Sequence, residues 1–558
     1  MKLAAVMMLS AALLTLTAVD AMANGTGFSV WAADALVKVL PTASAPTKPV
    51  GKVTIDAVRN EYESAQVVVT AQSAIEKLTF KVGKLEGPDG AKPRVEARFV
   101  GFVPVTRGTT DTPAEKLVAK APADIPDPLL VSSSVSVEAG KSRPIWLTAY
   151  VPKSAKTGTY TGSVELVGDG ASVSVPITVN VHAFTLPDVR TLYLTNWFDE
   201  GHVASGQKLR PWEEGHWKML EAYARMMAEH RQNVVITPIM ELIKGHDDGK
   251  GDLTFDFSRF DRWVEIFIKA GAIGYIEGSH LGGRGEWTAP DFDATRPTVF
   301  SPDGSVQPKP AVKVTSEQER VFLSQFLPAL QSHLEAKGWL GIYIQHLCDE
   351  PIPENAESYK KLSAYARRYA PKIKIIDACM CSQLVGALDI WVPQPPHYES
   401  DIKFFRERQE AGDQVWFYTC LSPKGKYMNR FIDFPLIDVR LMHWVNFKYG
   451  LTGYLHWGLN YWQGDPYKDL EPNWGGDSYL PPGDSHIVYP GPRGPISSIR
   501  FETLRDGVED YELLKLLESK DPKKARKICD SIVRSLTDYT LDPAEFRKAR
   551  AEIVKALE

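Results

Sequence analysis

The stretch "GWLGIYIQHLCDEP" (residues 338–351) determines the architecture expected for the longer part of this 558-residue chain. Its apolar run ends in polar residues, and the segment before it, "QERVFLSQFLPALQSHLEAKG" (318–338), has the spacing of an amphipathic helix. A helix that leads into a short buried strand is the repeating unit of parallel α/β folds. The stretch therefore predicts a strand whose carboxyl end carries Asp349 and Glu350.

The same unit recurs through residues 190–490, where short apolar runs alternate with segments of helical periodicity. The candidate strands are "TLYLTNWF" (191–198), "NVVITPIM" (233–240), "IGYIEGSH" (273–280), "LGIYIQHL" (340–347), "IKIIDACM" (373–380), "ALDIWVPQ" (387–394), "QVWFYTC" (414–420) and "TGYLHWGL" (452–459). Eight strands with helical connections predict a (β/α)8 TIM-like barrel over residues 190–490. Residues 491–558 predict a helical extension, in which Asp506 and Glu509 have the spacing of a capping box.

Residues 24–189 have a different pattern, with short β-branched runs separated by Gly, Pro, Ser and Lys. Apolar and polar residues alternate in "TGSVELVG" (161–168) and "SVSVPITVNV" (172–181). This alternation predicts an antiparallel β-sandwich as an N-terminal domain. The region carries no catalytic constellation, so we expect it to support the second domain or to bind a partner.

The first residues, "MKLAAVMMLSAALLTLTAVDAMA" (1–23), combine a lysine, an apolar stretch too short to span a bilayer, and small residues at Ala21 and Ala23. They predict a signal peptide, and no later run has transmembrane length. We therefore expect a soluble, exported protein that is periplasmic or secreted. The segment "CMC" (379–381) lacks the spacing of a zinc site. The five cysteines are therefore interpreted as buried thiols or as including one disulfide near the strand ends.

A net charge of -5 gives no electrostatic reason to expect nucleic acid or an anionic membrane as a partner. The 14 tryptophans and 21 tyrosines suit ligands that have both apolar faces and hydroxyl groups, such as sugars. The composition thus favours a glycan substrate, and it leaves the oligomeric state open.

In a barrel the active site lies at the carboxyl ends of the strands, so the residues that close each candidate strand are the candidates. They are Asn196, Trp197, Asp199, Glu200, His202, Glu277, His280, His346, Asp349, Glu350, Asp377, His397, Tyr398, Tyr418, His456, Trp457, Asn460 and Trp462. Carboxylates, aromatics and amides are typical of a glycosidase, and no glycine-rich phosphate loop occurs. We expect no metal and no cofactor.

Two acidic pairs compete for the catalytic role. Asp199 and Glu200 are either a solvated loop or a substrate contact. Asp349 and Glu350 follow a fully apolar strand, and Pro351 is expected to hold Glu350 in an extended conformation. The alternative for this second pair is a pair of acids at the start of a helix, where the dipole attracts them.

The adjacency of Asp349 and Glu350 bears on the mechanism. A retaining glycosidase places its two carboxyl groups about 5 Å apart across the bond, and an inverting one about 6.5 to 9.5 Å apart. Neighbouring residues on one strand end cannot easily flank a sugar in this way. They suit a substrate whose own 2-acetamido oxygen attacks the anomeric carbon, with one carboxyl as the acid and the other orienting the amide.

Four segments resemble glycoside hydrolase family 123, whose members are β-N-acetylgalactosaminidases. They are "HLCDEP" (346–351), "WFYTC" (416–420), "GYLHWGLNYWQGDPY" (453–467) and "SIRFETLRDGVEDYELLKLLE" (498–518). The resemblance covers about residues 190–558 and implies an exo-acting retaining enzyme that removes terminal β-linked 2-acetamido sugars by substrate-assisted hydrolysis.

The resemblance also implies roles for single residues. Glu350 resembles the general acid/base, Asp349 the residue that holds the acetamido group, and Tyr418 the tyrosine that hydrogen-bonds the acetamido oxygen. Trp457 and Trp462 are interpreted as pocket walls, with barrel packing as the alternative, and Asn460 as a hydroxyl contact. His346 and His280 are interpreted as substrate contacts, with satisfied structural groups as the alternative. Arg505, Glu509 and Asp510 match the family motif and are interpreted as structural.

Two other hypotheses remain open. A conventional retaining glycosidase would pair Glu350 with Glu277 or Glu200 and form a covalent glycosyl-enzyme. A glycan-binding protein would keep the fold and lose turnover, although the intact Asp349 and Glu350 argue against it.

Overall fold

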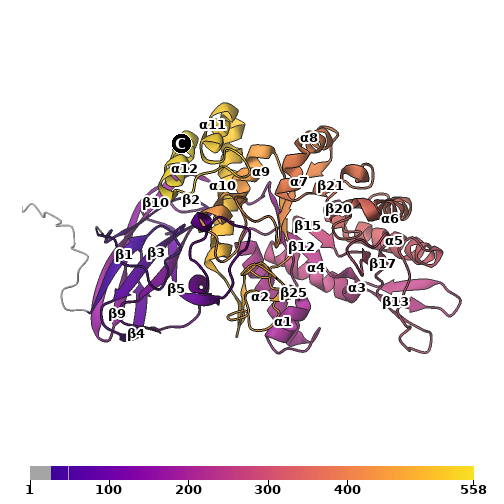
Figure 1. The fold of residues 1–558 in the computed structure, drawn as a ribbon, viewed down its shortest axis with the longest axis horizontal. Coiled ribbons are helices and arrows are strands. Elements are labelled where there is room, and N and C mark those ends of the chain that lie inside the picture. The colour runs from indigo at the N-terminus through magenta and orange to yellow at the C-terminus, as the bar shows by residue number, and fades with distance from the viewer. Residues whose placement is uncertain (1–26, 48) are drawn as a thin grey trace, which may run out of the picture.

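The computed structural model describes residues 27–47 and 49–558, so the expected signal peptide (1–23) lies outside the described residues. Figure 1 shows a β-rich N-terminal domain on the left and a larger domain with helices on the right. The last helices of the chain lie at the top, above the junction of the two domains.

The N-terminal domain consists of two five-stranded sheets, with strand orders β1-β3-β8-β5-β6 and β2-β10-β9-β4-β7. The strands are β1 (Phe28–Ala33), β2 (Val53–Arg59), β3 (Glu61–Ala71), β4 (Ile75–Val82), β5 (Arg94–Val105), β6 (Ala123–Leu130), β7 (Val135–Val137), β8 (Ser142–Val151), β9 (Gly158–Gly168) and β10 (Ala171–Thr185). Alternation in β10 buries Val175, Ile177 and Val179 in a core shared with both sheets. The expected β-rich domain is confirmed.

The larger domain contains short parallel strands that are buried on both faces. They are β11 (Tyr193–Asn196), β12 (Val234–Thr237), β15 (Tyr275–Gly278), β19 (Tyr343–Gln345), β20 (Lys374–Ala378), β21 (Ile390–Val392), β22 (Gln414–Val415), β23 (Phe417–Thr419) and β24 (Gly453–His456). The sequence predicted one closed ring. The ladders instead form two parallel sheets, β12-β15-β19-β20-β21-β22 and β11-β24-β23. The seventh candidate segment (414–420) is divided at Trp416, which places β22 and β23 in different sheets.

Helices connect these strands. They are α1 (Glu200–Gly206), α2 (Glu214–Glu229), α3 (Ile239–Leu242), α4 (Ser258–Ala270), α5 (Glu317–Lys337), α6 (Ala356–Tyr369), α7 (Pro395–Ser400), α8 (Ile402–Glu410) and α9 (Leu436–Tyr449). Short strands decorate the loops: β13 (Lys244–Asp247), β14 (Leu253–Asp256), β16 (Gly282–Gly283), β17 (Asp293–Ala294), β18 (Thr298–Phe300), β25 (Asn473–Gly475), β26 (Ser478–Tyr479), β27 (Tyr489–Gly491) and β28 (Gly494–Ile496). Helix α5 ends at the left-handed Gly338, immediately before the stretch that leads to Asp349.

The chain closes with α10 (Ile499–Lys520), α11 (Pro522–Ile532) and α12 (Pro543–Leu557). The expected capping box of Asp506 and Glu509 is wrong, because both residues lie inside α10. The helix begins earlier, where the Ser498 side chain accepts a hydrogen bond from the Phe501 N–H at 3.1 Å. The apolar pattern after Asp506 is strong, so the start of this helix was predicted too late in the chain.

Helix α10 joins the two domains through a buried ionic cluster. Arg440 of α9 contacts Asp506 at 3.1 Å and Asp510 at 2.6 Å, and it reaches Glu63 of β3 in the N-terminal domain at 2.9 Å. Arg550 of α12 contacts the same Glu63 at 3.3 Å and Asp510 at 3.1 Å. The charged residues of the family-like motif thus fix α10 against the sandwich.

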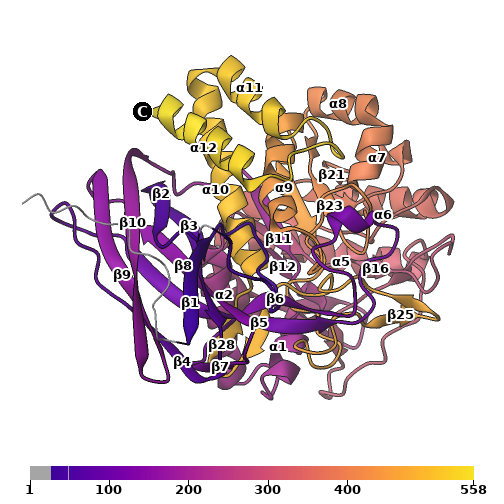
Figure 2. The same cartoon turned by 60° about the vertical axis from the view of Figure 1, so that its left-hand side comes forward.

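The N-terminal domain also reaches across the larger domain. Figure 2 shows the purple chain between β5 and β6 extending over the orange elements around β23. In this bridging segment (106–122), the backbone N–H groups of Arg107 and Gly108 donate to the Glu471 carboxylate at 2.9 and 2.6 Å. The Thr109 N–H donates to Asp433 at 2.6 Å. The N-terminal domain therefore anchors two loops of the larger domain.

All five cysteines are free thiols, three of them buried, which agrees with the interpretation as buried thiols and not with a disulfide. Among residues 27–47 and 49–558, no helix is long and apolar enough to cross a bilayer.

Candidate active site

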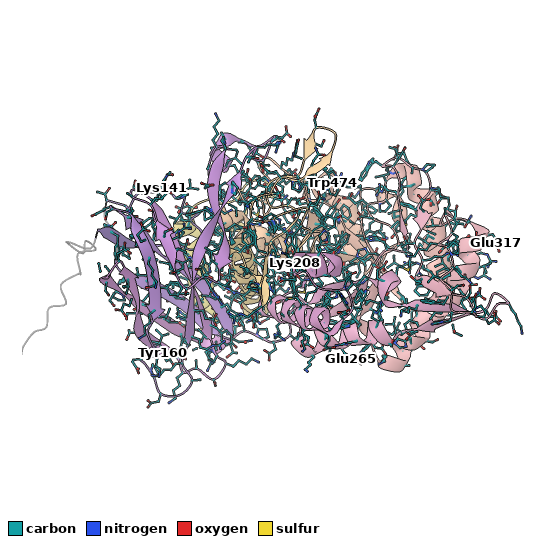
Figure 3. The ribbon with its side chains drawn as sticks, turned by 90° about the horizontal axis from the view of Figure 1, so that it is seen from below. Lys141, Tyr160, Lys208, Glu265, Glu317 and Trp474 are labelled. Atoms are coloured by element: carbon teal, nitrogen blue, oxygen red, sulfur yellow. The ribbon has the colours of Figure 1, made fainter. Side chains whose placement is uncertain are left out.

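A cavity of about 830 Å³ opens at the carboxyl ends of the parallel strands. Asp349 and Glu350 line it, together with side chains on or after four other strands. These are Trp197, Glu200, Gln394, Tyr418, Trp457 and Tyr461. Two half-exposed tryptophans, Trp287 and Trp474, also contribute to the lining. Figure 3 labels Trp474 on a hairpin that projects from the molecule.

The backbone at the acidic pair is bent. Glu350 has a φ of 45°, in the left-handed region, so the extended conformation expected from Pro351 is wrong. The Arg284 guanidinium donates hydrogen bonds to the carbonyl oxygens of both Asp349 and Glu350, and this shared donor draws the two carbonyls together. Such a conformation costs about 1 to 3 kcal/mol for a residue other than glycine, and it sets the direction of the Glu350 side chain.

The two carboxyl groups hold protons more tightly than isolated ones. Burial raises the pKa of Asp349 to about 7, and the charges of Glu350 and Asp377 add to this effect. Solvent reaches Asp349 through the cavity mouth, but protein encloses the carboxyl on its other sides, which accounts for the desolvation. Burial also raises the pKa of Glu350, although a hydrogen bond from Tyr418 and the Arg284 charge oppose the rise. Near neutral pH the pair therefore retains a proton.

Tyr418 contacts the acidic pair directly. Its hydroxyl donates a hydrogen bond to Glu350 Oε1 and accepts one from Gln394 Nε2 at 3.0 Å. Burial raises the pKa of Tyr418, so the phenol stays protonated and remains a donor. The Tyr418 hydroxyl thus supports the ionised form of Glu350.

A buried row of charged residues lies beneath Asp349. His346 Nδ1 is 2.7 Å from Asp377 Oδ1, and His346 Nε2 is 2.7 Å from Glu277 Oε1. Burial alone would lower the pKa of His346, but the two carboxylates outweigh it and raise the pKa to about 10. Glu277 also accepts from the Trp197 indole N–H at 2.9 Å. All three members of the row are fully buried, so His346 positions the strand ends and does not reach the cavity.

His280 stands next to this row, 3.6 Å from Asp377, and lines a neighbouring hollow of about 540 Å³. Burial, with the nearby His346 charge, lowers the pKa of His280 well below its usual value, so this ring is neutral. Donor atoms of His280, His346 and Asp377 lie within 4.8 Å of one another. Both ring nitrogens of His346 are already paired with carboxylates, of Asp377 and Glu277, so His346 offers no free nitrogen to an ion in this arrangement.

The three residues expected from "HWGLNYW" behave differently. Trp457 lines the cavity, and its indole N–H donates to Asp484 Oδ2 at 3.1 Å. Asn460 is fully buried and is not brought to the cavity, because its amide is paired with the backbone of Asp199 at 2.9 and 2.8 Å. Trp462 is also buried, with its N–H on the Val488 carbonyl at 3.0 Å. Asn460 and Trp462 therefore hold the loops together, which was the structural alternative for Trp462.

Models of known families match both parts of the chain. The glycoside hydrolase 123 catalytic domain matches residues 197–517, and the glycoside hydrolase 123 N-terminal domain matches residues 42–168. The chain belongs to glycoside hydrolase family 123. It is a glycoside hydrolase with an N-terminal β-rich domain and a helix-containing catalytic domain, as the sequence resemblance predicted.

The chain was also compared with solved structures, and one of them shares its fold. The chain is similar to a family 123 glycoside hydrolase from Clostridium perfringens, described for glycolipid glycan hydrolysis, at 18% identity and a TM-score of 0.73, over 95% of this chain and 97% of that chain. A GH10 xylanase with a bacterial Ig-like domain from termite gut matches at 11% identity and a TM-score of 0.34, over 83% and 100%. No match is found among the curated proteins.

Several residues of this family 123 site were missed or undervalued in the sequence. Asp199 and Glu200 both line the cavity. Burial raises the pKa of Glu200 to about 7, and Asp199 also accepts from the His202 N–H as the cap of α1. Both acids of this pair therefore face the cavity, and Asp199 has a structural role as well. Gln394 follows a strand as "WVPQ" and carried the same signal as the chosen residues. Arg284 lies on a loop with no periodic pattern, so its contact with the acidic pair appears only in three dimensions.

Proposed function

We propose that this family 123 enzyme is an exo-acting β-N-acetylgalactosaminidase that removes terminal β-linked 2-acetamido sugars by substrate-assisted retaining hydrolysis. The observation that carries the proposal is the pair of adjacent carboxyl groups in one cavity, both with a raised pKa and one bonded to Tyr418. The aromatic side chains of Trp197, Trp457 and Tyr461 suit the apolar faces of a sugar.

The contacts of the other carboxylates support this mechanism over a covalent one. Glu277 is fully buried and bonded to His346, Trp197 and Thr195, so it has no access to an anomeric carbon. Glu200 does face the cavity, but burial, with the charges of Asp199 and Glu241, raises its pKa to about 7, so it holds its proton more tightly than a nucleophilic carboxylate should. An internal nucleophile supplied by the substrate fills the vacant role.

The proposed reaction uses the two carboxyl groups in different ways. The acetamido carbonyl oxygen attacks the anomeric carbon, the glycosidic C–O bond breaks, and the leaving oxygen takes the proton of Glu350. Asp349, as a carboxylate, accepts the amide N–H and stabilises the positive oxazolinium-like ring. Glu350 then removes a proton from water, which attacks the anomeric carbon and reopens the ring with retained configuration.

Substrate binding also prepares the proton for this reaction. In the free site the Tyr418 hydrogen bond opposes the rise in the pKa of Glu350, while the pKa of Asp349 is raised to about 7. When the acetamido oxygen takes the Tyr418 hydroxyl, Glu350 loses that donor and its proton affinity rises. The proton shared by the pair is then held by Glu350, and the Asp349 carboxylate can accept the amide N–H.

The remaining proposals concern setting and fold. We propose that the enzyme is exported to the periplasm or secreted, in line with the signal peptide expected at residues 1–23. We propose further that it acts on the glycan of a glycolipid or glycoprotein; the likeness to the enzyme described for glycolipid glycan hydrolysis supports this substrate class. We also infer that the two parallel sheets are arcs of one barrel. Hydrogen bonds from the Asn233 N–H to the Leu194 carbonyl at 3.3 Å and from the Trp416 N–H to the Trp391 carbonyl at 2.8 Å support closure.

The function is tested with an aryl 2-acetamido-2-deoxy-β-galactoside and with the matching glycoside that lacks the acetamido group. We expect turnover of the first alone, and competitive inhibition by a thiazoline that mimics the cyclised acetamido group. The glucosamine epimer reports which amino sugar is preferred. Equal turnover without the acetamido group, or a fluorosugar adduct together with no thiazoline inhibition, would establish the conventional retaining mechanism instead.

The variant Tyr418→Phe tests the proposed proton placement. Loss of the hydroxyl removes a hydrogen bond that lowers the pKa of Glu350, so that pKa rises and the basic limb of the kcat/KM profile moves to higher pH. Because the hydroxyl also binds the acetamido oxygen, kcat/KM at the optimum falls by roughly 10- to 100-fold.

The matched control for Tyr418→Phe is Tyr427→Phe, which removes a hydroxyl that donates to Glu399 at 2.6 Å outside the cavity. We expect the pH profile of this control to match that of the unmodified enzyme. A Tyr418→Phe profile with an unmoved basic limb would refute the coupling between Tyr418 and the acid.

A further inference from the structure

Two large aromatic side chains of the cavity are left open to solvent. Trp287 is 50% exposed and Trp474 is 53% exposed, and both line the cavity that holds the acidic pair. Most other tryptophans of the catalytic domain are packed in its core, for example Trp263, Trp391 and Trp444. Indole rings exposed beside a binding cavity indicate a surface that a ligand covers.

The Trp287 ring contacts the arginine that binds the backbone of the acidic pair. Its ring lies 4.3 Å from the Arg284 guanidinium in a cation–π contact, and Arg284 donates to the carbonyls of Asp349 and Glu350. Trp287 therefore stands on the loop that holds the general acid. In the proposed reaction the leaving group departs beside this acid, so the Trp287 ring lies near the path of the leaving group.

Trp474 is held by the loop between β24 and β27. It belongs to β25 in a short hairpin with β26, and its ring centroid lies 5.6 Å from that of Trp457. Trp457 in turn is fixed by its hydrogen bond to Asp484. Trp474 thus extends the aromatic wall of the cavity outward, as its projecting position in Figure 3 shows.

The size of the cavity leaves room beyond one sugar. About 830 Å³ is in the upper part of the range for sites that enclose ligands much larger than a single pyranose ring. An exo-acting enzyme binds one terminal sugar at the acidic pair, so the remaining space adjoins the leaving-group side. That space is where Trp287 and Trp474 present their rings.

We propose that Trp287 and Trp474 form a leaving-group platform on which the sugars beyond the cleaved bond stack. The ligand class is a neutral oligosaccharide of at least two further pyranose rings, whose C–H faces pack on the indole rings. The inference rests on the proposed function and adds to it which side chains bind the sugars on the leaving-group side of the cleaved bond.

The bridging segment (106–122) of the N-terminal domain holds this platform. The Glu471 carboxylate, just before the β25–β26 hairpin, accepts the N–H groups of Arg107 and Gly108. The Arg107 guanidinium also lies 3.7 Å from the centre of the Tyr479 ring on β26. The hairpin is therefore clamped on two sides, which gives Trp474 a fixed position and lowers the ordering cost when a glycan binds.

The test compares two substrates with the same terminal sugar. One is a trisaccharide that ends in β-linked N-acetylgalactosamine, and the other is methyl 2-acetamido-2-deoxy-β-galactopyranoside, which has no second ring. For Trp474→Ala we expect the ratio of kcat/KM on the trisaccharide to kcat/KM on the methyl glycoside to fall roughly tenfold, mainly through a higher KM on the trisaccharide. Trp287→Ala is expected to act in the same direction.

Two further variants make the outcome specific. Trp474→Phe keeps a flat apolar face and is expected to recover most of the ratio. Ile268→Ala removes an exposed apolar side chain of α4 outside the cavity lining, and it is expected to leave the ratio unchanged. An unchanged ratio in Trp474→Ala, or an equal fall in Ile268→Ala, would overturn the platform. If the unmodified enzyme cleaves neither substrate, the proposed function fails, whereas cleavage of both with no effect of Trp474→Ala refutes the platform alone.

Discussion

Glu350→Gln is expected to lower kcat/KM for a natural glycan by roughly 10²- to 10⁴-fold, the usual contribution of a positioned general acid. Glutamine keeps the shape of the side chain and still accepts the Tyr418 hydrogen bond, but it has no proton to give. The loss should shrink as the leaving group improves, because an activated aryl oxide departs without protonation. A series of aryl 2-acetamido glycosides with different leaving-group pKa values measures this dependence.

Two variants serve as comparisons for Glu350→Gln. Asp349→Asn should slow all leaving groups alike, since in the proposed mechanism Asp349 acts on the acetamido group and not on the departing oxygen. Glu354→Gln changes an exposed acid four residues further along and should match the unmodified enzyme. If Glu350→Gln slowed good and poor leaving groups equally, Glu350 would not be the acid.

Arg440→Met is expected to reduce the free energy of unfolding by about 3 to 5 kcal/mol, the typical cost of removing one partner from a buried ion pair. Arg440 is fully buried among Glu63, Asp506 and Asp510, and methionine would leave these carboxylates without their central cation. Because Glu63 belongs to the sandwich and the other two to α10, the substitution also weakens the joint between the domains. Thermal and denaturant unfolding followed by fluorescence and circular dichroism measure both effects.

The control for Arg440→Met is Arg534→Met, which removes an exposed pair with Asp538 at 2.7 Å. Solvent screens such a pair, so we expect a cost below about 1 kcal/mol. A loss for Arg440→Met no larger than that for Arg534→Met would show that the buried cluster contributes specificity of docking and not stability.

The parts of the fold that could be predicted are those that depend on local sequence patterns. Alternation in residues 172–181 indicated the β-rich domain, and the strand at residues 340–347 placed Asp349 and Glu350 at a strand end. Whether the strands close into one ring could not be predicted from local patterns. It depends on how strands distant in sequence pair at their edges, and the break at Trp416 divides a segment that looks continuous in sequence.

The candidate site shows the same division between local and long-range causes. Residue type and position brought Asp349, Glu350, Tyr418 and Trp457 to one cavity. The rule for a residue before proline failed at Glu350, because the contact from Arg284, distant in sequence, imposes a different backbone. Asn460 was expected in the cavity for its amide, yet that amide is paired with the Asp199 backbone, a choice that no single-sequence pattern reveals.

The bridging segment (106–122) bears on how glycan preference can change in evolution. Residues that contact the Trp474 hairpin from the N-terminal domain, such as Arg107, lie far in sequence from both acidic residues of the pair. A change of glycan preference can therefore arise by substitution in a domain that supplies neither of those acids. If Trp474 binds glycan as proposed, exchange of the N-terminal domain between relatives is expected to alter glycan selectivity as well as stability.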